Sequence, residues 1–240
     1  MTTKQLRVII FIFILMMTSQ SFAAEYPLKL KNDFINFIDN QGGLEQAQQS
    51  ALHKTAELRA QCFNCHGEKG ISPDYTSNSN TITSNSKIYV GQQFNTPNLA
   101  AQQALYLIQQ LTEFMSNKRK NSVMHKISIK LSQEEIFLLA LYFSVQPAKV
   151  NAEPKQGSLD KIAAGKKIYL DRCQFCHGGD AAGQGIYARL AGLNYYYLFD
   201  NIQQFRDKKS QRKHAGMTSI TKGLSNSDIT QLALFLSTHN

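Results

Sequence analysis

The chemistry of this 240-residue chain is concentrated in its four cysteines, which form two short motifs of the same design. In each motif two residues separate a pair of cysteines, and a histidine follows the second one directly. The two motifs are Cys62-Phe63-Asn64-Cys65-His66 and Cys173-Gln174-Phe175-Cys176-His177. Cysteines three positions apart lie on one side of a helical turn, so both thiols can bond a single flat group. Cys-x-x-Cys-His is the attachment sequence of a c-type haem, whose iron the histidine binds. The motifs therefore predict two covalently attached haem c groups.

Three other uses of paired cysteines compete with this interpretation. Two pairs can share one zinc ion, but zinc ribbons separate their pairs by about 15–20 residues. Here 107 residues lie between Cys65 and Cys173. A thioredoxin-like redox pair needs a βαβ surrounding, whereas the sequence around both motifs is helical. Simple disulfide loops would not require His66 and His177, so haem attachment is favoured over all three.

The second axial position of each haem needs a ligand, and the sequence offers methionine. Beyond residue 23 the chain has three methionines, of which Met124 and Met217 each lie seven residues before a Leu-Ser pair. Met115 has no counterpart and is interpreted as core filling. We therefore predict Met124 for the first haem and Met217 for the second. A thioether is a soft, neutral ligand that favours ferrous iron and closes the site, which suits electron transfer and not substrate chemistry.

The histidines near these methionines are rivals for the same position. His125 and His214 do not match each other between the two halves of the chain, so we interpret both as surface residues, together with His53 and His239.

The two motifs belong to a duplication that covers most of the chain. They are 111 positions apart, and two later segments also match. Residues 99–114 match 190–205 at an offset of 91, and residues 131–142 match 224–235 at an offset of 93. The first copy carries about 20 extra residues after its motif, including the Ser- and Asn-rich stretch 72–87, which is typical of a surface loop. We predict an N-terminal domain over 24–148, a linker over 149–157 and a C-terminal domain over 158–240.

The elements that must position these residues are helices. Leu44, Ala47, Ala51 and Leu58 form one apolar stripe with helical spacing. Ala104, Leu107, Leu111 and Phe114 form another. Ser132 with Glu135, and more weakly Ser225 with Asp228, predict capping boxes at the start of each last helix. No convincing strand pattern appears, so the predicted fold class is all-α.

The N-terminus and the charge indicate where the protein works. Lys4 and Arg7 precede an apolar run of ten residues, and Ser21-Phe22-Ala23 is typical of a signal-peptidase site. We expect residues 1–23 to be a cleaved signal peptide and the mature chain to be soluble in the periplasm; an uncleaved membrane anchor is the alternative. Cleavage removes two cations and leaves 24 Lys+Arg against 17 Asp+Glu, a net charge of +7. This charge favours acidic protein partners or an anionic membrane surface over nucleic acid.

The order and spacing of these features resemble the class I cytochromes c, and specifically the tandem-domain, dihaem cytochrome c-four family. The resemblance rests on the two motifs, on Pro97-Asn98-Leu99-Ala100 and Ala188–Gly192, on residues 118–121 before Met124, and on the final helices. It covers nearly all of residues 44–240. It implies a periplasmic dihaem electron carrier with His and Met on each iron, built from two domains related by a pseudo-twofold axis.

The resemblance also implies how each domain is packed. The first and last helices should cross through a small residue and aromatic side chains. In the second copy Gly165 and Tyr169 would face Leu232 and Phe235, whereas the first copy has Lys54 and Leu58 where Gly165 and Tyr169 align. The proximal histidine of each haem should donate its second N–H to a backbone carbonyl, that of Pro97 in one copy and Ala188 in the other.

The sequence leaves the exact function open between two electron-transfer roles. One is a mobile carrier between respiratory partners such as a quinol–cytochrome c oxidoreductase and a terminal oxidase. The other is a fixed dihaem subunit of a periplasmic dehydrogenase complex. A haem enzyme such as a peroxidase needs an open axial site, which Met124 and Met217 disfavour. The expected docking residues are two cationic clusters that precede the ligand methionines: Lys118, Arg119 and Lys120 in the first copy, and Lys208, Lys209, Arg212 and Lys213 in the second.

Overall fold

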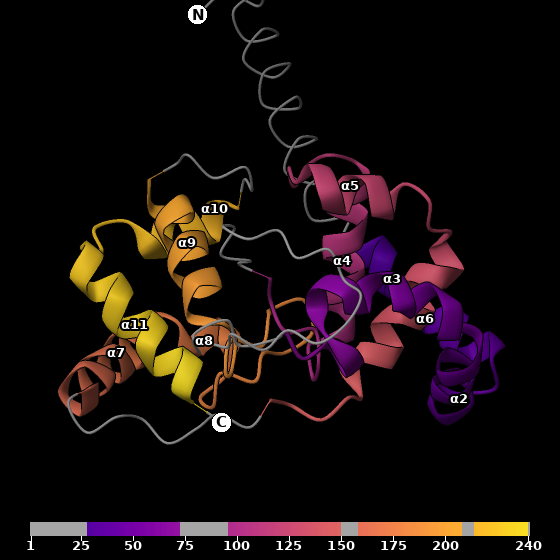
Figure 1. Ribbon diagram of the computed structural model, residues 1–240, viewed down its shortest axis with the longest axis horizontal. Helices are drawn as coiled ribbons and strands as arrows, with labels where there is room; N and C mark the ends of the chain where they lie inside the picture. The colour runs from indigo at the N-terminus through magenta and orange to yellow at the C-terminus, as the bar shows by residue number, and fades with distance from the viewer. Residues whose placement is uncertain (1–27, 73–95, 150–157, 208–213, 240) are drawn as a thin grey trace, which may run out of the picture. The chain divides into compact units, whose positions relative to one another are not determined.

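The computed structural model describes residues 28–72, 96–149, 158–207 and 214–239 (Figure 1). The described residues contain no β-strand, only an isolated bridge between Gln184 and Tyr187, which confirms the all-α class. The expected signal peptide, nearly all of the 72–87 insertion and of the 149–157 linker, and the cationic cluster at 208–213 lie outside the described residues. Within the described ranges, no helix combines the length and apolarity that crossing a membrane requires.

The chain divides into two compact units, residues 1–47 and residues 48–240. In the first unit residues 28–40 are helical, and the backbone then turns through Gly42 and Gly43. Both glycines have positive φ, 89° and 112°, and the Gly43 N–H donates to the Ile38 carbonyl at 3.0 Å. A residue without a Cβ adopts this left-handed geometry at little cost, so the two glycines end the helix. The sequence Glu25–Gly43 is thus largely helical where it is described.

The described residues of the first copy form five α-helices and a short 3-10 turn. They are α2 (Leu44–Lys54), α3 (Ala56–His66), η1 (Glu68–Gly70), α4 (Ala104–Met115), α5 (Ser122–Ser128) and α6 (Gln133–Ser144). The apolar stripe predicted before the first motif is only partly correct, because Leu44 is 52% exposed. The fully buried positions there are Ala47, Ala51 and Thr55. The Thr55 hydroxyl donates to the Ala51 carbonyl at 2.6 Å, a contact that bends helices, and α2 ends and α3 begins at this residue.

The second copy is built from α7 (Leu159–Arg172), α8 (Gln174–His177), α9 (Tyr195–Arg206), α10 (Ala215–Thr221) and α11 (Asn226–Thr238). Figure 1 shows α11 crossing in front of α7, and the two helices pack closely. Gly165 lies at the crossing, against the backbone of Gln231 and the Phe235 side chain. Tyr169 is fully buried, with its ring 5.7 Å from the Phe235 ring. The helix crossing expected for this copy is therefore confirmed.

In the first copy, the helices that correspond to α7 and α11 are held together by different contacts. Lys54, which stands where Gly165 aligns, is exposed and its Nζ lies 3.4 Å from Glu134 at the start of α6. Aromatic contacts replace the close backbone approach. The Phe63 ring lies 6.5 Å from the Tyr142 ring, and the Arg59 guanidinium covers Tyr142 at 4.4 Å. The eight residues from Ile136 to Phe143 are all buried, so α6 forms the centre of this copy's core.

The duplication is visible in equivalent hydrogen bonds. The Ala101 N–H donates to Phe143 O at 3.0 Å, and the matching Gly192 N–H donates to Leu236 O at 2.9 Å. Ala101 and Gly192 also share a positive φ, 56° and 74°. Both final helices begin with a complete capping box, so the second box, expected to be weaker, is fully formed. The same local geometry therefore holds the loop that follows each cysteine motif.

Candidate haem sites

Each motif histidine lies at the end of a helix with its ring oriented by a backbone carbonyl. His66 ends α3, and its Nδ1 lies 2.9 Å from Pro97 O. His177 ends α8, and its Nδ1 lies 2.8 Å from Ala188 O. These are the two carbonyls expected from the sequence. Because a carbonyl only accepts, Nδ1 carries the proton in both rings and the Nε2 lone pair remains available to a metal.

The surroundings of both histidines favour the neutral imidazole that binds iron. Burial lowers the pKa of His66, and the positive charge of Arg119 lowers it further. Burial likewise lowers the pKa of His177, with a smaller contribution from His214. A low-dielectric environment disfavours the imidazolium form. Burial therefore favours the neutral form of both histidines.

The cysteines have the properties of thiols awaiting attachment and not of a redox pair. No disulfide joins any two of the four. Burial raises the pKa of Cys62 to about 11, and burial raises the pKa of Cys173 to about 11. The attacking cysteine of a thioredoxin-like pair needs a lowered pKa, so the redox interpretation does not fit. The described residues also contain no cluster of three or more His, Cys, Asp or Glu that could hold zinc.

The loop after each motif is folded back by matching backbone bonds. The Leu99 and Ala100 N–H groups both donate to Gly70 O, at 2.7 and 3.1 Å. In the second copy Leu190 and Ala191 donate to Ala181 O, at 2.8 and 3.1 Å. These bonds hold the segments that contain the carbonyls of Pro97 and Ala188. The orientation of each imidazole is therefore set by the fold of a loop and not by a flexible side chain.

The two methionines predicted as ligands lie on short, capped helices. Met124 is in α5, where the Asn121 side chain accepts from the Val123 and Met124 N–H groups at 3.1 and 2.9 Å. Met217 is in α10, where the His214 Nδ1 accepts from the Met217 N–H at 3.2 Å. A side-chain hydrogen bond within each helix adds to the cap, because the Ser128 and Thr221 hydroxyls donate to the carbonyls of Met124 and Met217 at 2.7 Å. The two methionines thus occupy equivalent, half-buried positions.

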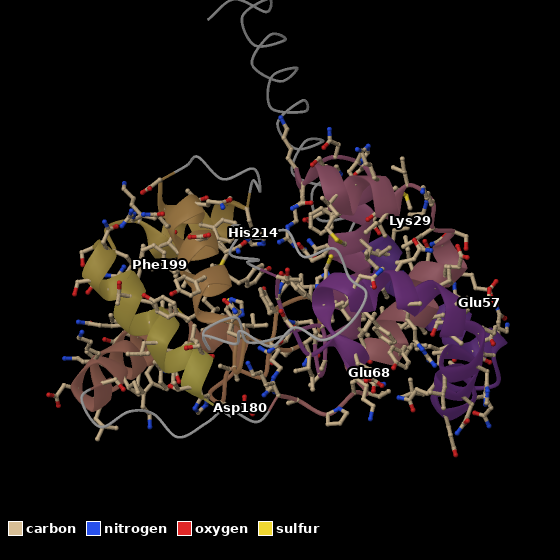
Figure 2. All side chains as sticks on the ribbon, in the orientation of Figure 1. Lys29, Glu57, Glu68, Asp180, Phe199 and His214 are labelled. Atoms are coloured by element: carbon tan, nitrogen blue, oxygen red, sulfur yellow. The ribbon has the colours of Figure 1, made fainter. Side chains whose placement is uncertain are left out.

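The remaining histidines and Met115 were not predicted to bind iron, and the structure shows where each of them lies. His214, labelled in Figure 2, is exposed as expected but caps α10 at the position that Asn121 occupies in the first copy. His53 is exposed, as expected. His125 and His239 are half-buried, so the surface assignment of these two is only partly correct: His125 Nδ1 lies 2.8 Å from Phe114 O, and the His239 ring lies 4.9 Å from the Phe235 ring. Met115 is the last residue of α4.

Arg119 has a different position from the one its sequence suggested. It was grouped with Lys118 and Lys120 as a docking residue, but its guanidinium donates to Gln110 Oε1 at 2.7 Å and to the Tyr197 hydroxyl at 3.2 Å. It also covers the Phe114 ring at 4.4 Å. Lys118 and Lys120 are exposed. Arg119 is therefore fixed within the protein, and nothing in a linear charge run distinguishes it from its neighbours.

These donor sets fit two haem groups. In each copy a helix end presents two thiols and one neutral imidazole, which are the groups that a c-type haem uses. A half-buried thioether lies on a capped helix later in the same copy. Within the described residues the haem interpretation accounts for both histidines and all four thiols, which the zinc and disulfide interpretations do not.

Comparisons with known proteins agree with this chemistry. A family model described as Cytochrome c matches residues 162–240. Cytochrome c-554(548) of Halomonas halodenitrificans is 35% identical over 77 residues, which cover 31% of this chain and 93% of that protein. Cytochrome c4 of Pseudomonas aeruginosa is 28% identical over 208 residues, which cover 81% of this chain and 90% of that protein. The thiosulfate dehydrogenase electron acceptor of Stutzerimonas stutzeri is 26% identical over 146 residues, which cover 57% of this chain and 68% of that protein.

The fold also has a solved counterpart. The crystal structure of reduced recombinant cytochrome c4 from Pseudomonas stutzeri superimposes with a TM-score of 0.63 and 23% identity, covering 80% of this chain and 98% of that one. This similarity supports the two-domain helical architecture.

Proposed function

Because the chain belongs to the class I dihaem cytochromes c and binds two covalent haem c groups, we propose that it is an exported electron carrier of the periplasm. It transfers single electrons between respiratory-chain partners, such as a quinol–cytochrome c oxidoreductase and a terminal oxidase. It performs no substrate chemistry of its own.

The proposal assigns four residues of each copy to one haem. Cys62 and Cys65 attach the first haem, and His66 and Met124 bind its iron. In the second copy Cys173 and Cys176 attach the haem, and His177 and Met217 bind its iron. The observation that carries the assignment is the matched pair of Nδ1 contacts, 2.9 Å to Pro97 O and 2.8 Å to Ala188 O. Each contact directs the unprotonated Nε2 away from the loop that orients the ring.

The bound haem supplies a reversible one-electron couple between ferrous and ferric iron. The protein residues determine how readily that couple works. Hydrogen bonds to Pro97 and Ala188 make the two imidazoles more basic, which stabilises ferric iron. The Met124 and Met217 thioethers would favour ferrous iron and would close each site against small molecules. Because the capped helices and folded loops fix these groups, they need little rearrangement when an electron arrives or leaves.

The proposal is tested by mass and spectrum of the exported protein. We expect a 217-residue mature chain carrying two haem masses, and a visible spectrum in which the oxidised form shows the weak red band of methionine–iron ligation. A chain with one haem, or with no haem and two disulfides, would refute the attachment residues. Two haems without the red band would leave attachment intact and refute the methionine ligands.

The alternative role is a fixed dihaem subunit of a periplasmic dehydrogenase complex. The similarity to a protein named as the electron acceptor of thiosulfate dehydrogenase favours it. Gel filtration of native periplasm separates the two roles, because a mobile carrier elutes near 27 kDa or below and a subunit elutes with its larger partner.

A further inference from the structure

Polar side chains of the first copy bond to the backbone of the second copy, beside the loop that orients His177. Gln102, Gln103 and Asn98 provide these contacts, and all of them lie within the unit formed by residues 48–240. Gln102 and Asn98 are almost fully buried, with 4% and 5% of their surface exposed. A buried amide must satisfy its donor and acceptor, so these contacts are part of the fold and not incidental.

Gln102 makes the most specific of these contacts. Its Oε1 accepts from the Arg189 N–H at 2.6 Å, and its Nε2 donates to Arg189 O at 3.0 Å. One side chain therefore holds both backbone groups of a single residue in the other copy. The Gln102 Oε1 also accepts from the Gln103 N–H at 3.0 Å, which fixes the amide from its own side.

Arg189 directly follows Ala188, whose carbonyl accepts from His177 Nδ1 at 2.8 Å. The peptide unit between these two residues contains both the carbonyl that orients the imidazole and the N–H that Gln102 binds. A peptide unit is planar and rigid, so fixing its N–H fixes the direction of its carbonyl. The same N–H···O=C alignment polarises the carbonyl and strengthens its hydrogen bond to His177.

Asn98 makes a second contact from the first copy to the second, beside that of Gln102. Asn98, which directly follows Pro97, donates from Nδ2 to Gly192 O at 2.7 Å, and its Oδ1 accepts from the Ser72 N–H at 2.8 Å. Residue 98 thus contacts residue 192, while residue 102 contacts residue 189, so the two loops run antiparallel. Both residues after the oriented carbonyls, Asn98 and Arg189, are in contact with the opposite copy.

We propose that Gln102 is a positioning residue for the second haem: by holding both backbone groups of Arg189 it fixes the Ala188 carbonyl, and so the first domain sets the orientation and basicity of His177. The proposal rests on His177 being an axial ligand. A weaker Nδ1–H···O contact makes the imidazole less basic, which stabilises ferric iron less. Loss of the Gln102 contact should therefore raise the potential of the second haem more than that of the first.

The test uses the holoprotein with Gln102→Leu, and Gln102→Asn as a milder variant that keeps an amide but is one methylene too short. In the reduced protein the His177 Nδ1 proton is followed by NMR, and both haem potentials are measured by redox titration. We expect faster solvent exchange of the His177 proton, an upward shift of the second potential, and a smaller shift of the first.

Gln103→Leu is the matched control. Gln103 is the adjacent residue of the same type, and its Nε2 also makes two contacts to the second copy, to Ala182 O at 3.0 Å and Gly183 O at 3.2 Å. It does not touch the peptide unit that orients His177. If the two copies were merely joined, both variants would change exchange and potential alike, and that result would overturn the proposal. An unchanged His177 proton and second potential in both folded, dihaem Gln102 variants would also overturn it.

The haem content and the red absorption band of each variant are recorded in parallel. These report on attachment and on methionine ligation, so a failure of the proposed function is distinguishable from a failure of the role assigned to Gln102.

Discussion

At the scale of single residues, the surroundings of His66 and His177 determine which ring nitrogen carries the proton and how readily the ring gains a second one. The carbonyls of Pro97 and Ala188 accept from Nδ1, and burial lowers the pKa of both rings. The two effects oppose each other on the pKa: the hydrogen bond fixes the tautomer and raises the pKa, whereas burial, the larger effect, lowers it. The tautomer of each imidazole is thereby set by a group outside the motif itself.

The methionine assignment leads to a prediction about potential. Met217→His should keep both haems attached but lower the potential of the second haem by on the order of 0.2 V, a part of the roughly 0.8 V range that axial ligands span. Imidazole stabilises ferric iron better than a thioether does. Redox titration of the purified protein measures the change.

Met115→Leu is the control for this prediction. Met115 ends α4 and has no equivalent in the second copy, so its replacement should leave both potentials nearly unchanged. A fall in potential with Met115→Leu as large as that with Met217→His would show that the two copies have been aligned incorrectly.

Residue-level prediction from the sequence worked where the duplication supplied a second example. The carbonyls of Pro97 and Ala188 were located because each precedes the matching Leu-Ala pair in its copy. Gln102 could not be found in this way, because Leu193 occupies the equivalent position in the second copy. Its partner, Arg189, is 87 residues away, and no local pattern encodes a contact between two copies of a repeat.

At the scale of helices, the α7–α11 crossing depends on the absence of one Cβ. A Cβ added at Gly165 would overlap the Gln231 carbonyl oxygen and stand 2.9 Å from the Phe235 Cβ. Backbone atoms cannot move aside as a side chain can, so Gly165→Ala should destabilise the second domain by about 1–3 kcal/mol. Denaturant unfolding followed through the haem absorption measures the loss.

The matched control is Gly179→Ala, because a Cβ added at Gly179 meets no atom within 4 Å. Its replacement should change the free energy of unfolding little. If Gly165→Ala were equally neutral, α7 and α11 would not pack as closely as described.

The start of α11 offers a prediction about pH. Hydrogen bonds from the backbone and hydroxyl of Ser225 lower the pKa of Asp228 below its ordinary value of 3.8. A carboxyl whose pKa is lower in the folded state stabilises the fold above its unfolded pKa, and this stabilisation is lost as pH falls through the folded pKa. Asp228→Asn should therefore cost up to about 1 kcal/mol at neutral pH, because the group is exposed and screened. The difference should vanish in strong acid.

Thermal unfolding of wild type and variant across the acid range measures this difference. Asp171→Asn, at an exposed position in α7, controls for the general effect of removing one negative charge. A difference between wild type and Asp228→Asn that stays constant down to strongly acidic pH would contradict a role for the ionised carboxylate.

Helix-level prediction from the sequence was reliable for caps and for the second copy. Both capping boxes and the Gly165 crossing were expected, because each depends on residues a few positions apart or on a family pattern that this copy keeps. The bend at Thr55 was not expected. Its cause is a hydroxyl that bonds within the helix, and a buried threonine among apolar residues gives the same pattern as an uninterrupted stripe.

At the scale of the whole molecule, the two haem sites belong to one compact unit whose halves differ in charge. Residues 150–240 contain 12 Lys+Arg against 7 Asp+Glu, whereas residues 25–149 contain 12 against 10. The duplication therefore made two similar redox centres within unequal electrostatic surroundings. Because opposite charges speed encounters without tight binding, an acidic partner should approach the second copy more often.

The charged residues that should guide this approach are those just before Met217. They are Lys208, Lys209, Arg212 and Lys213, which lie outside the described residues. In the first copy Arg119 is held by Gln110 and Tyr197, so it keeps its charge but is not available to contact a partner directly. The exposed cations of that cluster are Lys118 and Lys120.

Replacement of the four residues before Met217 by Gln should slow electron exchange with an acidic redox partner severalfold at low salt. Stopped-flow rates measured at increasing ionic strength should converge with those of the wild type, because exposed charges are screened over about 10 Å at 0.1 M salt. The control changes three exposed cations of α7, Lys161, Lys166 and Lys167, to Gln. General loss of positive charge would slow both variants to a similar extent, whereas a local docking surface slows only the first. Equal slowing, or an unchanged rate at low salt, would show that the partner docks elsewhere.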